Sequence, residues 1–291
     1  MTTLLAEAEL VESRAILPGQ WIGSFHAPHV ASGARAGQFV HLRDPDPTTE
    51  LLRRSVPLNT ADPSTGIVTL HVRTPRSRFG DPSPVGRLRA GDRVGLVGPF
   101  GRPFEVDPRS RHLLLIAAGL GVAALRMLAD EAVRDGRQVT LLFGAPAARD
   151  VYPSSLLPDE VEYVVATADG SLGHHGPVTD LVPAYEAWAD QAFAAGPRTL
   201  LAELARHAAG RRERMGVANL GRKRGGGRPE PMGSATARRK AFLQVALDQP
   251  VGCAAATCLG CAVLGAGGVP LRTCREGPVF SAPELDWDAL P

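Results

Sequence analysis

Residues 112–136, HLLLIAAGLGVAALRMLADEAVRDG, decide the fold of the second half of the chain. The stretch begins with a continuous apolar run, the pattern of a strand that is covered on both faces. Gly119-Leu120-Gly121 follows, and apolar residues then recur at helical spacing until Gly136. Strands alternating with helices predict a parallel α/β sheet. Further strands are expected at residues 139–143, 163–167, 191–195 and 242–247, and helical segments around residues 178–188 and 198–208.

The region before this stretch has a different pattern. Residues 38–42 and 66–72 alternate or are rich in β-branched side chains, and Gly, Pro and Asp separate such stretches. Gly91-Asp92 introduces another strand at residues 93–97, and no helix is expected in residues 8–105. This pattern predicts a small antiparallel β-barrel.

The chain therefore divides into four predicted parts. We expect a barrel domain, an α/β domain, a basic flexible linker or insertion and a short C-terminal segment. Their expected limits are residues 1–107, 108–208, 209–240 and 241–291.

Composition places the chain among ordinary globular proteins. Its 291 residues are 44% hydrophobic and 21% charged. No apolar run approaches the roughly 20 residues of a membrane-spanning helix, and no signal peptide is visible at the N-terminus. We therefore expect a cytoplasmic protein that does not bind membranes.

Basic charge is concentrated in one segment. Between Arg211 and Lys240 there are ten basic and two acidic residues, although the net charge of the whole chain is only +2. A nucleic-acid binder usually spreads basic charge over a folded face with aromatic residues among it, and this segment has none. We therefore expect no nucleic-acid binding. The segment has no apolar period and is predicted to be a flexible linker.

All four cysteines lie within 22 residues near the C-terminus. Cys253-x4-Cys258-x2-Cys261, followed by Cys274, is the spacing typical of a plant-type 2Fe-2S cluster. The residues between the first three are small, so the backbone can wrap a cluster and direct amide groups at its sulfurs. Two disulfides, a structural zinc site and free core thiols are the alternatives, and zinc sites more often have two Cys-x2-Cys pairs.

A second motif, Gly119-x-Gly121-x-x-Ala124, lies between the expected strand and helix. Helix-terminal amides in this context bind a pyrophosphate, but a tight turn without a ligand has the same sequence. The acidic residue that a Rossmann fold places after its second strand is not found after Phe143. The motif therefore indicates either a simple turn or a nucleotide site of another lineage.

Two further clusters have weaker signals. Arg53-Arg54 precedes Ser55 between two expected strands; these arginines are either a solvated pair or a guanidinium fork for a phosphate. His174-His175 has no third ligand nearby in the sequence, so we expect no metal there.

Taken together, these parts resemble the ferredoxin-reductase-like flavoproteins, and within them the family of dihydroorotate dehydrogenase B electron-transfer subunits. The most specific match runs from Pro250 to Phe280 and contains the four cysteines. The loop at residues 167–173, Thr-Ala-Asp-Gly-Ser-Leu-Gly, is also similar to that family. The chain departs from the family in having Pro57 in place of the final Ser of the flavin motif, and Ala195 in place of the Cys of a Cys-Gly-Pro turn.

The resemblance implies an antiparallel β-barrel flavin domain, a parallel α/β nicotinamide domain and a small C-terminal 2Fe-2S segment. It implies FAD, NAD and a 2Fe-2S cluster as cofactors. The implied FAD-binding residues are Arg54, Ser55, Val56, Pro57, His71, Val72 and Arg73, with Arg54 on the phosphate; Gly119, Gly121 and Gly196 approach NAD; Cys253, Cys258, Cys261 and Cys274 bind the cluster.

The resemblance also implies a partner. A catalytic subunit containing FMN oxidises dihydroorotate, and electrons cross the cluster and FAD to NAD+, as part of pyrimidine biosynthesis in a heterotetramer. One alternative is an NAD(P)H-dependent reductase subunit for a hydrogenase, a sulfur reductase or ferredoxin. Another is a non-catalytic relic with zinc or nothing at the cysteines.

Overall fold

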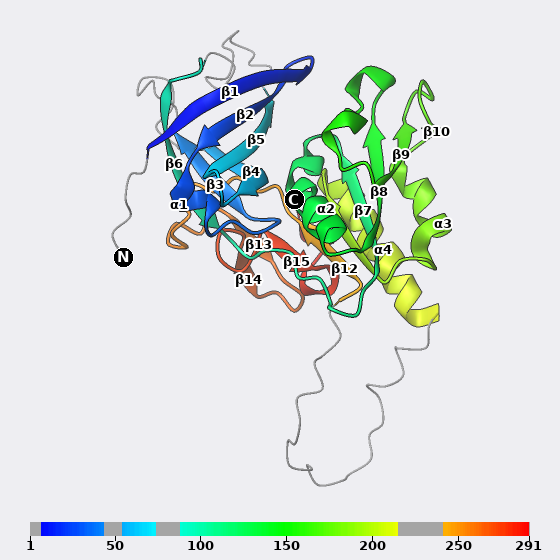
Figure 1. Cartoon of the computed structure of the whole chain (residues 1–291). Helices are drawn as coiled ribbons and strands as arrows, with labels where there is room; N and C mark the ends of the chain where they lie inside the picture. The colour runs from blue at the N-terminus through cyan, green and yellow to red at the C-terminus, as the bar shows by residue number, and fades with distance from the viewer. Residues whose placement is uncertain (1–6, 44–53, 74–87, 215–240, 291) are drawn as a thin grey trace.

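The computed structural model describes residues 7–43, 54–73, 88–214 and 241–290. They form a closed barrel, a seven-stranded sheet and a two-stranded hairpin (Figure 1). The barrel strands are β1 (Glu7–Leu17), β2 (Gln20–His26), β3 (Phe39–Arg43), β4 (Arg54–Asp62), β5 (Ile67–Arg73) and β6 (Arg93–Phe100).

The barrel closes in the order β1-β2-β5-β4-β3-β6, and every pairing in it is antiparallel. Alternate residues of β5 point inward, because successive side chains of a strand lie on opposite faces. Val68 and Leu70 are fully buried there, with Phe25 from β2. The predicted barrel is therefore confirmed.

The seven-stranded sheet has the order β10-β9-β8-β7-β11-β12-β15. All its pairings are parallel except that of β12 with β15. Its strands are β7 (His112–Ala118), β8 (Gln138–Ala145), β9 (Glu162–Thr167), β10 (His174–His175), β11 (Gln191–Ala195), β12 (Leu243–Ala246) and β15 (Val279–Ser281). The helices of this region are α2 (Val122–Arg134), α3 (Val182–Glu186) and α4 (Arg198–Arg214).

Both faces of the central strands are covered, as the apolar run predicted. Leu113 and Leu115 lie in one buried cluster with α2, whereas Leu114 and Ile116 lie in the other, with residues of α4. The stripe of α2 that includes Leu125 and Leu128 also packs against the barrel strand β4. The parallel α/β fold is confirmed, and α2 joins the two parts of the molecule.

Several details differ from the expectations. A short helix, α1 (Pro28–Ala31), interrupts the barrel region, where none was expected; Pro28 stands at its first turn, where the fixed φ of proline favours a helix. The helix α4 runs to Arg214, so residues 209–214 of the predicted linker are helical. Both β12 and β15 come from the predicted C-terminal segment, yet they extend the seven-stranded sheet.

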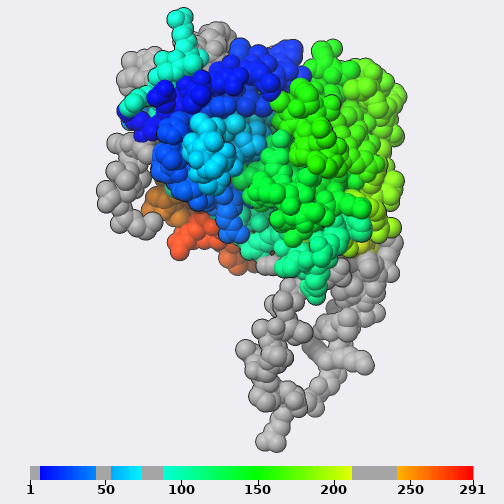
Figure 2. Space-filling model, viewed as in Figure 1, coloured from blue at the N-terminus to red at the C-terminus, as the bar shows by residue number. Residues whose placement is uncertain are grey.

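The C-terminal segment is also docked on the barrel. The Arg102 amide donates a 2.5 Å hydrogen bond to the Gly277 carbonyl, and the Arg102 guanidinium lies 3.3 Å from Glu284. A Cβ on Gly101 would lie 2.3 Å from Pro278, so glycine permits this close approach. The hairpin of β13 (Ala262–Leu264) and β14 (Pro270–Arg272) belongs to the same segment. Figure 2 shows the orange and red C-terminal residues beneath the blue barrel.

Residues 215–240 of the predicted basic linker lie outside the described residues. Arg53 lies outside them too. Among the helices of the described ranges, none is long and apolar enough to cross a membrane.

Candidate functional site

A cavity of about 490 Å³ lies where the barrel, the α/β sheet and the C-terminal segment meet. Each part supplies a wall: β4 and β5 from the barrel, the loops after β7 and β11 from the sheet, and residues 246–249, 251, 273 and 278 from the C-terminal segment. All ten residues that the resemblance implied for FAD and NAD line this cavity. They are Arg54, Ser55, Val56, Pro57, His71, Val72, Arg73, Gly119, Gly121 and Gly196.

Two glycine loops form the sheet wall. They follow β7 and β11, which are paired neighbours, so both lie at the carboxyl edge of the sheet. A Cβ on Gly121 would lie 2.1 Å from the Ala195 carbonyl oxygen, so only glycine lets the two loops approach this closely. Gly119 has φ +55°, in the left-handed region that favours glycine. Each loop leads directly into a long helix, α2 or α4, and the first amides of a helix attract phosphate groups.

His71 is the buried titratable group of the barrel wall. Its Nε2 lies 2.9 Å from Gln20 Oε1, and its ring lies 5.7 Å from that of Tyr152. Burial lowers the pKa of His71 to about 4, with a smaller contribution from the Arg73 charge, so the imidazole is neutral near pH 7. Its Nδ1 is buried without a hydrogen-bond partner.

The cavity fits a dinucleotide in its chemistry. Arg54 and Arg73 supply cationic groups on the barrel side, and the glycine loops supply backbone amides on the sheet side. Most of the surface that lines the cavity is apolar, which suits an aromatic ring system. The chemistry of these residues fits the phosphate and ring groups of FAD and of a nicotinamide nucleotide.

Sequence reasoning missed the third wall. Leu247, Asp248 and Gln249 follow β12 and line the cavity, and the Arg198 guanidinium donates a hydrogen bond to Gln249. The signal for this wall was the strand at residues 242–247, because residues after a parallel strand lie at the carboxyl edge of its sheet. Thr273, next to a cysteine, was also missed.

The cysteine loop has an unusual backbone. Ala254, Ala256 and Leu259 have φ values of +48°, +59° and +57°, a region that non-glycine residues rarely adopt. This conformation turns backbone amides toward the cysteine sulfurs. The Ala255 amide donates to Cys253 Sγ at 3.4 Å, and the Gly260 amide donates to Cys258 Sγ at 3.4 Å. Such strain is found where a ligand or function requires it.

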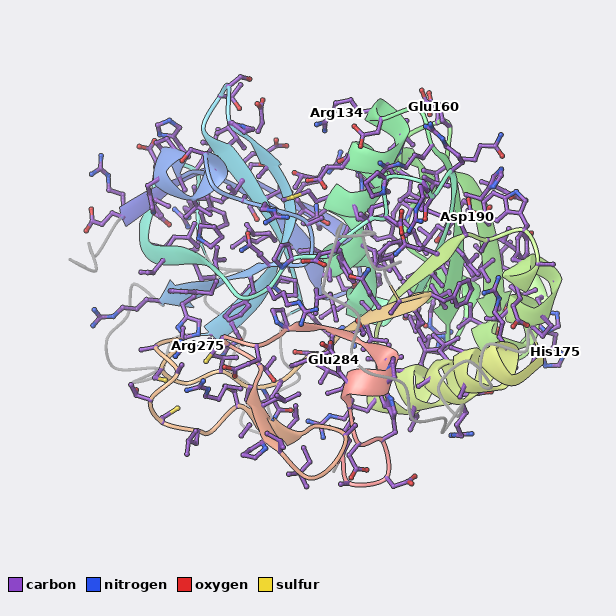
Figure 3. All side chains as sticks on the ribbon, turned by 90° about the horizontal axis from the view of Figure 1, so that it is seen from below. Arg134, Glu160, His175, Asp190, Arg275 and Glu284 are labelled. Carbon is purple, nitrogen blue, oxygen red and sulfur yellow. The ribbon has the colours of Figure 1, made fainter. Side chains whose placement is uncertain are left out.

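Arg272 fixes this loop to the hairpin. Its guanidinium donates to both carboxylate oxygens of Glu276, at 2.5 and 3.0 Å, and to the Ala256 carbonyl at 3.3 Å. The ion pair with Arg272 holds the pKa of Glu276 at about 2. Figure 3 shows the sulfur atoms of the orange segment beside Arg275, beneath the barrel.

The four thiols have different surroundings. Hydrogen bonds from the Cys258 and Thr257 amides, and others nearby, lower the pKa of Cys253 to about 6. Burial, together with the neighbouring Cys261, raises the pKa of Cys274 to about 11. Cys258 is exposed, whereas Cys261 and Cys274 are buried. All four are free thiols, so the disulfide alternative is wrong in this structure.

The donor set fits a 2Fe-2S cluster. Thiolates are the ligands of such clusters, and hydrogen bonds from amides to their sulfurs tune them. In the described ranges, no three His, Cys, Asp or Glu side chains are arranged to hold a single metal ion. A 2Fe-2S cluster has two iron atoms, and each takes two of the four thiolates.

Comparison with known proteins agrees with this geometry. Residues 248–286 match the family model described as the iron-sulfur cluster binding domain of dihydroorotate dehydrogenase B. The chain is 27% identical to the protein named dihydroorotate dehydrogenase B (NAD(+)), electron transfer subunit, of Desulforamulus reducens, over 97% of this chain and 98% of the relative. A protein of the same name from Shouchella clausii is 28% identical over 87% and 86% of the two chains.

Solved structures show the same fold. The structure of an NADH-dependent reduced ferredoxin-NADP oxidoreductase superposes with a TM-score of 0.75 at 24% identity, over 98% of this chain and 91% of that chain. Phthalate dioxygenase reductase superposes with a TM-score of 0.54 at 20% identity, over 74% and 65% of the two chains. The resemblance predicted from the sequence is confirmed.

Proposed function

We propose that this chain, a relative of dihydroorotate dehydrogenase B electron-transfer subunits over nearly its whole length, transfers electrons from a dihydroorotate-oxidising partner to NAD+. The observation that carries the proposal is the position of the cavity. The two glycine loops line one side of it, and Val251 and Thr273 of the segment that bears the four cysteines line another, which supports neighbouring sites for a nucleotide, a flavin and a cluster. NAD+ accepts two electrons as a hydride, whereas a cluster exchanges single electrons. A flavin is needed between them, because it exchanges either one or two electrons.

The residues of this chain hold the cofactors. Cys253, Cys258, Cys261 and Cys274 would bind the 2Fe-2S cluster. Arg54 would hold the FAD phosphate, while His71, Val72 and Arg73 would line the flavin. Gly119, Gly121 and Gly196 let the backbone approach NAD.

The overall reaction balances without another reactant. Dihydroorotate loses two electrons and two protons on the partner and becomes orotate. NAD+ takes both electrons with one proton, as a hydride, and the other proton is released to solvent. A 2Fe-2S cluster held by the four cysteines would supply single-electron transfer between the two. Within this chain, the cavity walls orient the two nucleotides and exclude bulk water from the transfer.

The partner is proposed to be an FMN-containing catalytic subunit in a cytoplasmic heterotetramer. The relatives are named as electron transfer subunits, which implies a second, catalytic subunit in their complexes. The exposed thiol of Cys258 and the neighbouring exposed Leu259 give such a partner access to the cluster loop.

Reconstitution tests this function. The chain is co-expressed with a dihydroorotate dehydrogenase catalytic subunit, and NAD+ reduction by dihydroorotate is followed without oxygen. We expect NADH formation by the complex and none by the catalytic subunit alone. A complex that fails to form, together with NADH-driven reduction of a hydrogenase, a sulfur reductase or ferredoxin, would contradict the proposal and favour a general reductase subunit.

A further inference from the structure

Three residues line the cavity and also adjoin the buried cysteines. Phe39, Val251 and Thr273 line the cavity. Phe39 and Val251 also belong to one buried cluster with Cys261 and Cys274, and Thr273 is the residue before Cys274. We call these three residues the shared wall.

The shared wall is buried and in contact with its surroundings on several sides. Its three residues are at most 5% exposed, and the Thr273 hydroxyl donates a 2.9 Å hydrogen bond to the Cys261 carbonyl. The Phe39 ring lies 5.8 Å from that of Phe100, at the barrel end next to the docked C-terminal segment. The backbone contacts of Gly101 and Arg102 join the barrel to the segment that carries the cysteines.

The two cysteine pairs face opposite environments. Cys261 and Cys274 lie against the shared wall, and both are at most 5% exposed. Cys258 is exposed and Cys253 half-buried, and both accept hydrogen bonds from their own loop. The cysteine loop therefore has an inner pair beside the cavity and an outer pair toward solvent.

We infer that Phe39 is a positioning residue for electron transfer between the cluster and the flavin, and that this exchange passes through the inner pair, Cys261 and Cys274. The inference rests on the proposed function. Phe39 lines the cavity and packs in the same buried cluster as the inner cysteines, so its ring contributes to the packing between them. A gap there would replace packed atoms with empty space and weaken the contact between the two centres.

The redox step is a single-electron exchange. Each electron leaves the reduced cluster, which is thereby oxidised, and enters the flavin, which is reduced. After two such passes the flavin holds the pair that NAD+ accepts as a hydride. Phe39 takes no charge and no proton, and acts only through the packing of the shared wall.

Three variants test the inference. Phe39→Leu removes the ring of the shared wall, Phe39→Tyr keeps it, and Phe100→Leu removes a neighbouring ring that does not line the cavity. FAD content, iron content and the midpoint potentials of both centres are measured first. Two rates follow: reduction of the flavin by NADH, and reoxidation of the flavin by the cluster in a single turnover.

We expect all three variants to retain both cofactors and the normal rate of flavin reduction by NADH. Phe39→Leu should slow only the exchange between flavin and cluster, by several-fold, and Phe39→Tyr and Phe100→Leu should leave it near the wild-type rate. An unchanged exchange in Phe39→Leu, or equal slowing in Phe100→Leu, would overturn the inference. If Phe39→Leu does not fold, a slowed exchange in Phe39→Tyr would overturn it as well. Wild-type protein without FAD would contradict the proposed function itself.

Discussion

The cysteine loop and the cofactor cavity are built in opposite ways. The loop takes all four of its cysteines from 22 consecutive residues, and its shape comes from local backbone turns at Ala254, Ala256 and Leu259. The cavity takes its walls from residues between Gly37 and Pro278, which only the tertiary fold brings together. The local site depends on the spacing of its cysteines, whereas the distributed site depends on strand order and on close approach of backbones. Substitution of a cysteine should therefore damage the loop site most, and substitution of residues that hold the walls together should damage the cavity most.

The largest expected effect is at the loop. Cys258→Ala removes one of four thiolates, so the cluster should be lost or become labile. Electron flow from dihydroorotate to NAD+ should stop, because the cluster supplies the one-electron step. FAD should stay bound and should still be reduced by NADH, since the cavity does not include Cys258. Iron and sulfide analysis, with both activity assays, checks this prediction; normal dihydroorotate-dependent rates would contradict it.

The second effect compares two glycines of one cavity wall. A Cβ on Gly121 would meet the backbone of Ala195 and Gly196, so Gly121→Ala should destabilise the fold by about 3 kcal/mol or more. Gly119 has open space around a Cβ, so Gly119→Ala should cost only about 1–2 kcal/mol, from its left-handed backbone. Thermal unfolding and NAD binding measure the difference. Equal melting temperatures would show that the two loops are not in close contact.

The third effect separates the cavity from the loop. Arg54→Ala should weaken FAD binding by roughly tenfold to hundredfold, the loss of one charge-assisted hydrogen bond to a phosphate. The cluster should be unaffected, because the cysteines lie in another segment. Arg43→Ala, an exposed arginine of β3 that does not line the cavity, is the matched control. FAD retention that is the same in both variants would remove Arg54 from the flavin site.

The sequence predicted the local cysteine loop better than the distributed cavity. Cysteine spacing is a local property, so the four candidate ligands were identified without the fold. The strand at residues 242–247 was also expected, but its place beside β11, and the antiparallel addition of β15, depend on tertiary pairing that periodicity does not contain. For that reason Gln249 and Thr273 were missed as cavity residues. Gln249 nevertheless follows the strand expected at residues 242–247, and Thr273 precedes Cys274.

The smallest effect is a pH dependence of stability. The pKa of His71 is about 4 in the folded chain and 6.5 ordinarily, so below pH 6.5 the unfolded chain binds a proton that the folded chain does not. The contribution of neutral His71 to the free energy of unfolding is therefore complete above pH 6.5. It is lost as the pH falls toward 4, and the total loss is up to about 3 kcal/mol. In His71→Gln, melting temperatures between pH 7 and pH 5 should fall less steeply than in wild type. His26→Gln, at an exposed position, should keep the wild-type slope. A His71→Gln slope equal to that of wild type would contradict the prediction.

The most direct test of the account is the visible spectrum of the purified full chain, measured with its iron, sulfide and FAD content. The account predicts absorption from both a flavin and a 2Fe-2S cluster, with iron and acid-labile sulfide in equal amounts. NADH should bleach the flavin contribution, and Cys258→Ala should remove only the cluster contribution. A colourless protein, or one that holds zinc without iron and flavin, would contradict the account and identify the chain as a relic that kept the fold without the redox centres.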